Sequence, residues 1–324
     1  MRRFFGLIAV SLLASTVAAA PAPADTYPSR PIHILVPYAP GGVSDIAARL
    51  VGQKLSDALG QPVIVENRPG GNGFIAVTAM LRAPADGYTL IVGTIGEFAI
   101  NPALYKEVPY DVEHDLVPVA MLSDTPLVFA TNGDSPYHSV QEVVAAAKAK
   151  PETLGTSSPG AGTFNHIAIE QLNLRAGIKL LHVPYRGGAP AAAAVAAGDV
   201  PLSVLAISSA VPFLQSGKIR VLAVTTAKRS SFNADWKTLK EEGVPNINAS
   251  NWVGMFASKQ VPTPIVEKLH DEIQKILVMP DIREHFAIGG ADTTPMSAAD
   301  FAARIKSDTE DFKKIVAEAG IHVE

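Results

Sequence analysis

Glycine-rich segments that directly precede helical stretches hold the residues of this chain best suited to binding chemistry. Leu35 and Val36 end a β-forming run, and Gly41 and Gly42 follow in the loop before an amphipathic helix. Without a Cβ, these glycines let the main chain turn sharply and approach a ligand. The first N–H groups of the next helix lack intrahelical partners, and the macrodipole adds a partial positive charge there. The segment therefore predicts a backbone site for a carboxylate or phosphate that needs no lysine or arginine.

The same order of β-forming run, glycine-containing loop and helix recurs three more times. The further loops are residues 93–97, 158–163 and 184–188. In an open parallel sheet such loops lie beyond the carboxyl ends of the strands, where ligands bind. Glycine in a single short strand-to-helix turn usually has only a structural use. Four such loops together favour a shared ligand site.

Alternating β-forming and helical stretches, which continue to about Thr226, must position these loops. The alternation predicts an α/β fold with largely parallel sheets. Ser44 and Thr163 have the residue types of helix N-caps, and glycines just past three helical stretches are expected to end them. Helices are expected at residues 45–59, 75–82, 98–104, 164–176, 190–197, 264–278 and 298–319.

Extended segments are predicted to cross between two lobes. Apolar runs at residues 117–122 and 127–131 flank a candidate first crossing at 123–126, and a second crossing is expected near 252–256. About 300 mature residues are enough for two separate cores. Lobe 1 is then discontinuous, with residues 25–124 and 250–324, and lobe 2 comprises residues 125–249.

Residues 1–24 have the pattern of a secretory signal peptide. Arg2 and Arg3 precede an apolar core from residue 4 to about 17, and small residues follow. Roughly 14 apolar residues fall short of the ~20 that a membrane span needs, which disfavours a retained anchor. We expect cleavage after Ala24 and a soluble, exported mature protein.

Composition excludes several other classes of function. The 324 residues carry a formal net charge of −4, and lysine and arginine are dispersed along the chain, so a nucleic acid is not an expected partner. The chain has no cysteine, which excludes a disulfide framework and a thiolate nucleophile.

Enzyme motifs are weak or absent. Residues 71–76 match the G-x-G-x-x-A form of a dinucleotide fingerprint, but Pro69 and Gly70 lengthen the turn before it. No P-loop, nucleophile elbow, S-x-x-K or H-E-x-x-H sequence is present. His166 and Glu170 share a helical face and could form half of a zinc site, yet they lack a nearby third ligand, and a helix-face hydrogen bond is the commoner use of such a pair. No catalytic residue, metal or cofactor is expected.

Six segments, in their order and spacing, resemble the Bug family of periplasmic solute receptors, the binding subunits associated with tripartite tricarboxylate transporters. Examples are Tyr-Pro-Ser-Arg-Pro-Ile at residues 27–32 and His-Val-Pro-Tyr-Arg-Gly at residues 182–187. The full set is residues 27–32, 37–45, 66–73, 99–105, 182–187 and 216–225. The resemblance spans nearly the whole mature chain and implies a two-lobed periplasmic binding protein fold of type II, with a hinge that closes on a small carboxylated solute.

The resemblance also implies which residues contact the solute, mainly through loop amides, hydroxyls and water. Gly41, Gly42 and Gly162 would give backbone access, Ser44 and Thr163 would offer hydroxyls, and Tyr38 and Tyr185 would form walls. First-lobe contacts are expected at Tyr38, Pro40, Gly41, Gly42, Val43, Ser44, Asp45, Thr94, Gly96 and Glu97. Second-lobe contacts are expected at Gly160, Ala161, Gly162, Thr163, His166, Tyr185, Arg186 and Gly187.

Three features depart from the simple carboxylate site. Pro201 and residues 232–238 differ from the family's usual pattern, which bears on the second-lobe end of the pocket. Glu97 lies inside a loop expected to bind an anion, where a carboxylate would repel a carboxylate. It is expected either to face solvent or to contact the ammonium group of an amino acid.

The sequence therefore predicts a periplasmic, monomeric binding protein that captures a di- or tricarboxylate, an amino acid or an aromatic acid for the membrane subunits of a tripartite tricarboxylate-type transporter. One alternative is a ligand-sensing receptor for a membrane signalling partner. Another is an α/β enzyme acting on a carboxylated substrate, which would require catalytic groups to converge in the cleft. The identity of the solute stays open, because a backbone-based carboxylate site accepts many acids.

Overall fold

A computed structural model describes residues 27–247 and 249–321. Nine strands form one continuous, mixed sheet, with β8 paired to β4 beside the main path. The predicted signal peptide lies outside the described residues. Along the main path the strands are β2 (Val63–Asn67), β1 (Ile32–Val36), β3 (Thr89–Thr94), β9 (Ser250–Ser258), β4 (Leu116–Asn132), β7 (Leu202–Ala206), β5 (Gly155–Ser158) and β6 (Leu181–Pro184), and the remaining strand is β8 (Ile219–Val224).

Parallel pairing occupies the outer parts of the sheet, and antiparallel pairing occupies its middle. β1 pairs in parallel with β2 and β3, and β5 pairs in parallel with β6 and β7. The long strand β4 is antiparallel to β9 in its first part and to β7 and β8 in its second. The α/β prediction is confirmed, and the glycine loops after β1, β3, β5 and β6 all follow carboxyl ends of parallel strands.

The predicted crossing at residues 123–126 lies within β4, which runs through it as one continuous strand of 17 residues. Asp124 and Pro126 pair with Trp252 and Ser250 of β9, and the amide of Asp124 also donates to the carbonyl of Asp292. These neighbours pair with the backbone N–H and C=O groups of residues 124–126, which allows the strand to continue through a polar segment. The boundary proposed between residues 124 and 125 therefore falls within a continuous strand.

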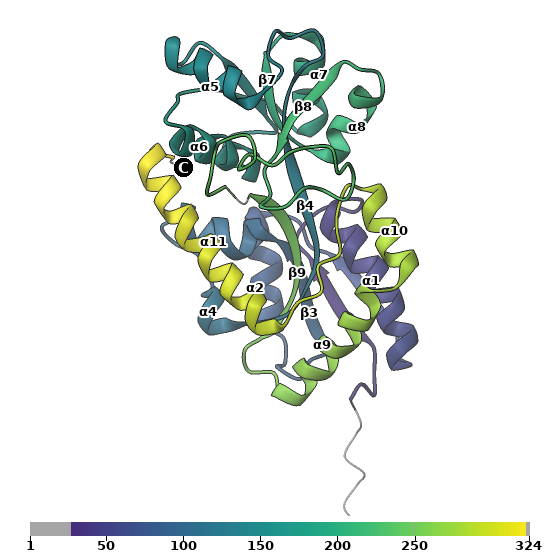
Figure 1. The fold of residues 1–324 in the computed structure, drawn as a ribbon. Coiled ribbons are helices and arrows are strands. Elements are labelled where there is room, and N and C mark those ends of the chain that lie inside the picture. The colour runs from purple at the N-terminus through teal and green to yellow at the C-terminus, as the bar shows by residue number, and fades with distance from the viewer. Residues whose placement is uncertain (1–26, 248, 322–324) are drawn as a thin grey trace, which may run out of the picture.

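Helices cover both faces of the sheet (Figure 1). In the lower part of Figure 1 they are α1 (Val43–Leu59), η1 (Gly71–Gly73), α2 (Phe74–Arg82), η2 (Gly96–Ile100), α3 (Asn101–Leu104), α4 (Val112–Asp115), α9 (Thr263–Leu277) and α10 (Pro280–Ile288). In the upper part they are α5 (Val140–Ala149), α6 (Phe164–Ala176), α7 (Gly188–Ala197) and α8 (Ile207–Gln215). Gly60, Gly177 and Gly320 adopt left-handed conformations at helix ends, as the sequence predicted. Within the described ranges, no helix is long and apolar enough to cross a membrane.

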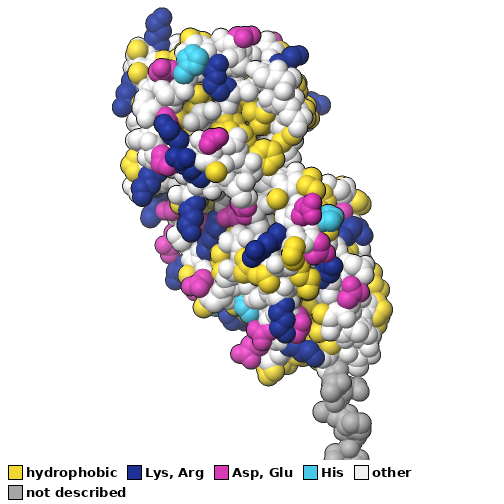
Figure 2. All heavy atoms as spheres, turned by 45° about the vertical axis from the view of Figure 1, so that its right-hand side comes forward, with side chains coloured by type: hydrophobic (Ala, Val, Ile, Leu, Met, Phe, Trp, Pro, Cys, Tyr) yellow, Lys and Arg dark blue, Asp and Glu magenta, His cyan; other side chains and the backbone are white. Residues whose placement is uncertain are grey.

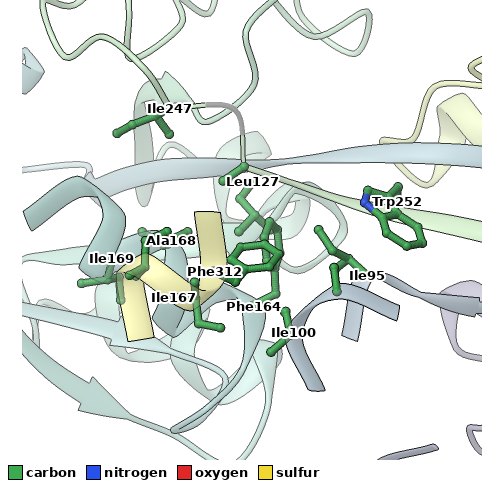
Figure 3. Packing of buried hydrophobic residues seen from close by; sticks show 14 of the residues in the cluster. Ile95, Ile100, Leu127, Phe164, Ile167, Ala168, Ile169, Ile247, Trp252 and Phe312 are labelled. Carbon is green, nitrogen blue, oxygen red and sulfur yellow. The ribbon is translucent and has the colours of Figure 1, made fainter. Parts of the chain in front are cut away.

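The final helix, α11 (Ala298–Ala319), joins the two parts of the molecule. In Figure 1 it runs from the lower part up to α6. The ring of Phe312 on α11 packs edge-on against Phe164 of α6, with centroids 6.2 Å apart. Ile95, which follows β3, belongs to the same buried cluster as these two rings (Figure 3). The lobe boundaries stay a prediction, and α11 contributes to the packing of both predicted lobes.

Charged side chains are dispersed on the surface. On the face in Figure 2, lysines and arginines are interspersed with aspartates and glutamates over both parts of the molecule. Exposed ion pairs of the described structure include Arg30 with Asp86 and Arg229 with Glu241. This distribution agrees with the dispersed charge of the sequence.

Candidate functional site

The loop after β1 leads directly into the N-terminus of α1. The helix begins at Val43, and its first intrahelical bond runs from the amide of Ile46 to the carbonyl of Gly42 at 3.0 Å. Gly42 is the N-cap, with extended backbone at φ −79° and no side-chain cap, whereas Gly41 needs glycine's freedom at φ +89°. The amides of the first turn therefore point out of the helix beside an exposed loop, an arrangement that suits an anion.

Ser44 is not the N-cap, because the helix begins one residue before it. Its side chain is 1% exposed, and its hydroxyl has no hydrogen-bond partner in the described part of the chain. Buried hydroxyl groups in proteins are nearly always paired, so the unpaired hydroxyl beside this helix N-terminus makes Ser44 a candidate contact for a bound polar molecule.

Replacing Ser44 with alanine is expected to leave the free energy of unfolding within about 0.5 kcal/mol of the parent, because the substitution removes a buried group that lacks a partner. Urea denaturation measures this. Ser297 is the matched control, since its hydroxyl accepts the amide of Asp300 at 3.0 Å as a true N-cap. Ser297→Ala should cost about 1 kcal/mol. Equal losses in the two variants would contradict the absence of a cap at Ser44.

Asp45 stabilises the β1–α1 loop through hydrogen bonds of its side chain. Its buried carboxylate accepts the amide of Gly41 at 2.9 Å, the guanidinium of Arg49 at 3.0 Å and the amide nitrogen of Asn67 at 2.9 Å. Burial alone would raise the pKa of Asp45, but these hydrogen bonds hold it below its ordinary value. The Gly41 amide is thus already occupied, and the backbone access predicted from this loop falls to Gly42 and the residues after it.

Glu97 is buried, so the expectation that it faces solvent is wrong. Its side chain is 1% exposed. The hydroxyl of Tyr38 donates to Oε1, while the amide and hydroxyl of Thr94 donate to Oε2 at 2.7 and 3.0 Å. Burial raises the pKa of Glu97, and these donors oppose the rise. The structure thereby ties Tyr38 of the β1 loop to Thr94 and Glu97 of the β3 loop.

Two glycines make room for the Glu97 carboxyl. A Cβ added to Gly73 would lie 2.4 Å from the Glu97 Cγ, and one added to Gly93 would lie 3.0 Å from Oε2. In the sequence Gly73 belongs to a rejected dinucleotide fingerprint and to the family-like segment 66–73, and it was not among the expected solute contacts. Its φ of +90° and this close approach give it a structural role in the first-lobe site.

The loop after β5 is held by its own polar groups. Thr163 caps α6 as predicted, accepting the amide of His166 at 3.3 Å, and its hydroxyl donates to the carbonyl of Gly160 at 2.7 Å. The amide of Gly162 donates to Nδ1 of His166 at 3.1 Å. Ala161 lies exposed between these anchored residues.

His166 packs beneath this loop in a cluster with His182. The two imidazole rings stack at 3.8 Å, and Ser158 Oγ hydrogen-bonds to Nε2 of His182 at 2.6 Å. Nε2 of His166 lies 3.6 Å from Glu170, which supports the helix-face reading of this pair over a zinc site. Burial and the neighbouring His166 lower the pKa of His182 to about 4, so His182 is neutral at physiological pH.

The loop after β6 is joined to the loop after β5. The amide of Tyr185 donates to the Ser158 carbonyl, and that of Gly187 donates to the Pro159 carbonyl, both at 2.9 Å. Tyr185 is partly buried and Arg186 is exposed. The structure thus brings together the predicted contacts within each lobe. Ile95, beside the β3 loop, and Phe164 of α6 belong to the same buried cluster (Figure 3).

Pro201 lies away from these loops. It directly precedes β7, so it is at the amino end of a strand that runs parallel to β5, whereas the β5 loop follows the carboxyl end. Its carbonyl accepts the hydroxyl of Thr131 at 2.8 Å. This departure from the family pattern therefore bears on the opposite end of the sheet, not on the candidate pocket.

Four cavities of the described structure lie apart from the predicted contacts. Their volumes are about 300, 510, 560 and 640 Å³, and none of the four is lined by a predicted site residue. The largest lies between α3, α4 and α11. The candidate site therefore rests on loop geometry and on the unpaired hydroxyl of Ser44.

An ionic network joins the crossing strands to α11. Arg304 donates to Asp124 of β4 at 2.9 Å and to the hydroxyl of Ser250 of β9 at 2.6 Å, and it lies 3.6 Å from Asp308. Asp308 also accepts the indole N–H of Trp252 at 2.8 Å. Burial raises the pKa of Asp308 to about 6, despite the nearby guanidinium. Sequence analysis missed this network, although Arg304 and Asp308 fall on the apolar face of an amphipathic helix.

Comparisons with known proteins agree with this geometry. Residues 47–321 match the model of the tripartite tricarboxylate transporter family receptor. Protein BugT of Bordetella pertussis is 34% identical over 323 residues, covering 99% of this chain and 98% of BugT. A Rhodopseudomonas palustris protein solved with adipate is 31% identical, with a TM-score of 0.76 over 91% of this chain and 99% of that one. MatC of the same organism, solved with malate, is 29% identical, with a TM-score of 0.72 over 90% and 100%.

Proposed function

The chain belongs to the tripartite tricarboxylate transporter family of periplasmic solute-binding receptors, and we propose that it captures a small carboxylated metabolite and delivers it to the membrane subunits of such a transporter. Receptors of this family bind solutes and are not enzymes. The protein would reach the periplasm through the signal peptide predicted at residues 1–24, which is then removed.

The observation that carries the proposal is the N-terminus of α1. Its first-turn amides lie beside the exposed Gly42, and the buried hydroxyl of Ser44 has no partner in the described structure. A carboxylate placed there would gain backbone hydrogen bonds, the helix dipole and one hydroxyl donor. The adipate and malate bound by two relatives support a small acid as the ligand.

We propose that the first lobe supplies Pro40, Gly42, Val43 and Ser44 to the carboxylate end of the site, while Tyr38 forms a wall. The second lobe would close over the solute with the residues of its two joined loops. These are Gly160, Ala161, Gly162, Thr163, Tyr185, Arg186 and Gly187. Asp45 and His166 would act by holding the loops, because their polar groups are already engaged within the protein.

A solute that binds only the folded receptor should raise its melting midpoint. At a hundredfold excess over the dissociation constant the stabilisation is about 2.7 kcal/mol. For a chain of this size 1 kcal/mol shifts the midpoint by about 2–4 °C, so the right acid should raise it by roughly 5–10 °C. The measurement is differential scanning fluorimetry of the mature protein, freed of co-purified solute by unfolding and refolding.

The panel should hold C4 to C6 di- and tricarboxylates, amino acids and aromatic acids, with nucleotides and sugars as controls. At least one carboxylate is expected to shift the midpoint. A midpoint that no carboxylate moves, but that a nucleotide or sugar raises, would refute the proposed function.

A further inference from the structure

We propose that the Tyr38–Thr94–Glu97 cluster makes the part of the first-lobe site beside Tyr38 an acceptor of hydrogen bonds, so that the solute carries a hydroxyl or amino donor in addition to its carboxylate. This inference rests on the proposed function and narrows its ligand class. It assigns Glu97 as a positioning residue that acts through the hydroxyl of Tyr38.

The hydrogen-bond count at the cluster supports this assignment. The phenol of Tyr38 has one donor hydrogen, and it is given to Oε1 of Glu97. The hydroxyl of Thr94 also has one, and it is given to Oε2 at 3.0 Å, beside the amide of the same residue at 2.7 Å. Burial and the Glu97 carboxylate raise the pKa of Tyr38, so the phenol keeps its proton. The Tyr38 oxygen also lies 3.2 Å from Oγ1 of Thr94. Because both hydroxyl hydrogens are given to Glu97, what Tyr38 retains for a ligand is acceptor capacity and no donor.

The charge of the cluster points the same way. No lysine or arginine forms an ion pair with Glu97 among the described residues, and the hydroxyl of Tyr110 is engaged by the Glu97 carbonyl at 2.7 Å. A second carboxylate of a solute placed against Tyr38 would meet acceptors and a buried negative charge. A hydroxyl group would find an acceptor there, and an ammonium group would in addition supply the missing positive charge.

The test compares acids that differ only by one donor. The dissociation constants of the solute-free, refolded protein are measured by titration calorimetry for succinate, malate and aspartate, and for glutarate, 2-hydroxyglutarate and glutamate. Because a site built around a hydrogen bond rejects an analogue that lacks the partner, the best donor-bearing acid should bind about tenfold or more tightly than its unsubstituted counterpart. Unsubstituted acids that bind equally well or better overturn the inference while the carboxylate function stands. If no acid of either series binds, the inference falls, and the wider thermal-shift panel decides the carboxylate function separately.

Two variants separate this role from a merely structural one. In Glu97→Gln the amide oxygen can still accept from Thr94, but the amide nitrogen donates to Tyr38, whose hydroxyl is then free to donate outward. The variant should therefore shift the ratio of affinities toward the unsubstituted acid, by about tenfold or more. Tyr38→Phe removes the hydroxyl and should abolish the discrimination without reversing it. An unchanged ratio in folded Glu97→Gln overturns the positioning role.

Discussion

Replacing Gly42 with valine is expected to abolish solute binding while the protein stays folded. Gly42 has φ −79°, which valine can adopt, and the nearest atom to an added Cβ is a backbone oxygen 3.8 Å away. The fold therefore has room for the side chain. The branched side chain would stand over the first-turn amides of α1 and block the approach of a carboxylate, which should weaken binding by about a hundredfold or more, or about 2.7 kcal/mol. Calorimetric titration with the acid found by thermal shift measures the loss.

Gly289→Val provides the matched control. Gly289 has nearly the same φ, −81°, lies exposed at the end of α10 and is not among the proposed solute contacts. The dissociation constant of Gly289→Val should equal that of the parent protein, and the melting midpoints of both variants should lie within a few degrees of the parent's. Undiminished affinity in Gly42→Val would remove the β1 loop from the binding site.

Replacing Arg304 with methionine is expected to cause the largest loss of stability. The guanidinium is 18% exposed and faces Asp124 and Asp308, which are similarly buried. Without it both carboxylates would lie in a poorly solvated site with no cation, and the free energy of unfolding should fall by about 2–3 kcal/mol. Urea denaturation measures the change.

The loss should also depend on pH. The folded-state pKa of Asp308, about 6, is raised above its ordinary value, so the stability linked to its proton is present at low pH and disappears as the pH rises through 6. At pH 8 Asp308 is ionised and needs the Arg304 cation, whereas at pH 5 it is mostly protonated. The loss of unfolding free energy in Arg304→Met should therefore be larger at pH 8 than at pH 5. Lys314→Met on the same helix removes an exposed pair with Asp311, 3.8 Å apart, and should cost no more than about 1 kcal/mol. A loss in Arg304→Met no greater than in Lys314→Met would contradict a stabilising role for the network.

The sequence by itself determined the fold class, the ends of the helices that it predicted to within about two residues, and the family, but it gave no sign of α5, α8 or α10. The helix predicted at residues 298–319 has those bounds in the structure, and Thr163 caps the helix that Gly177 ends. These features depend on residues close together in the chain: a hydroxyl at the first turn, a glycine where the backbone turns left-handed, and apolar side chains at helical spacing. Local chemistry is sufficient to predict them.

The tertiary structure alone decided the continuity of β4, the burial of Glu97 and the role of Arg304. Ser44 has the residue type of an N-cap, yet Gly42 takes that place and leaves the Ser44 hydroxyl buried and unpaired. Glu97 is polar and follows a strand, yet it is buried, because Gly93 nearby in sequence and the more distant Gly73 leave room for its carboxyl group. Each outcome depends on which groups distant segments place beside a side chain. Residue type and spacing do not contain that information, because the free energy of a buried polar group is set by its partners.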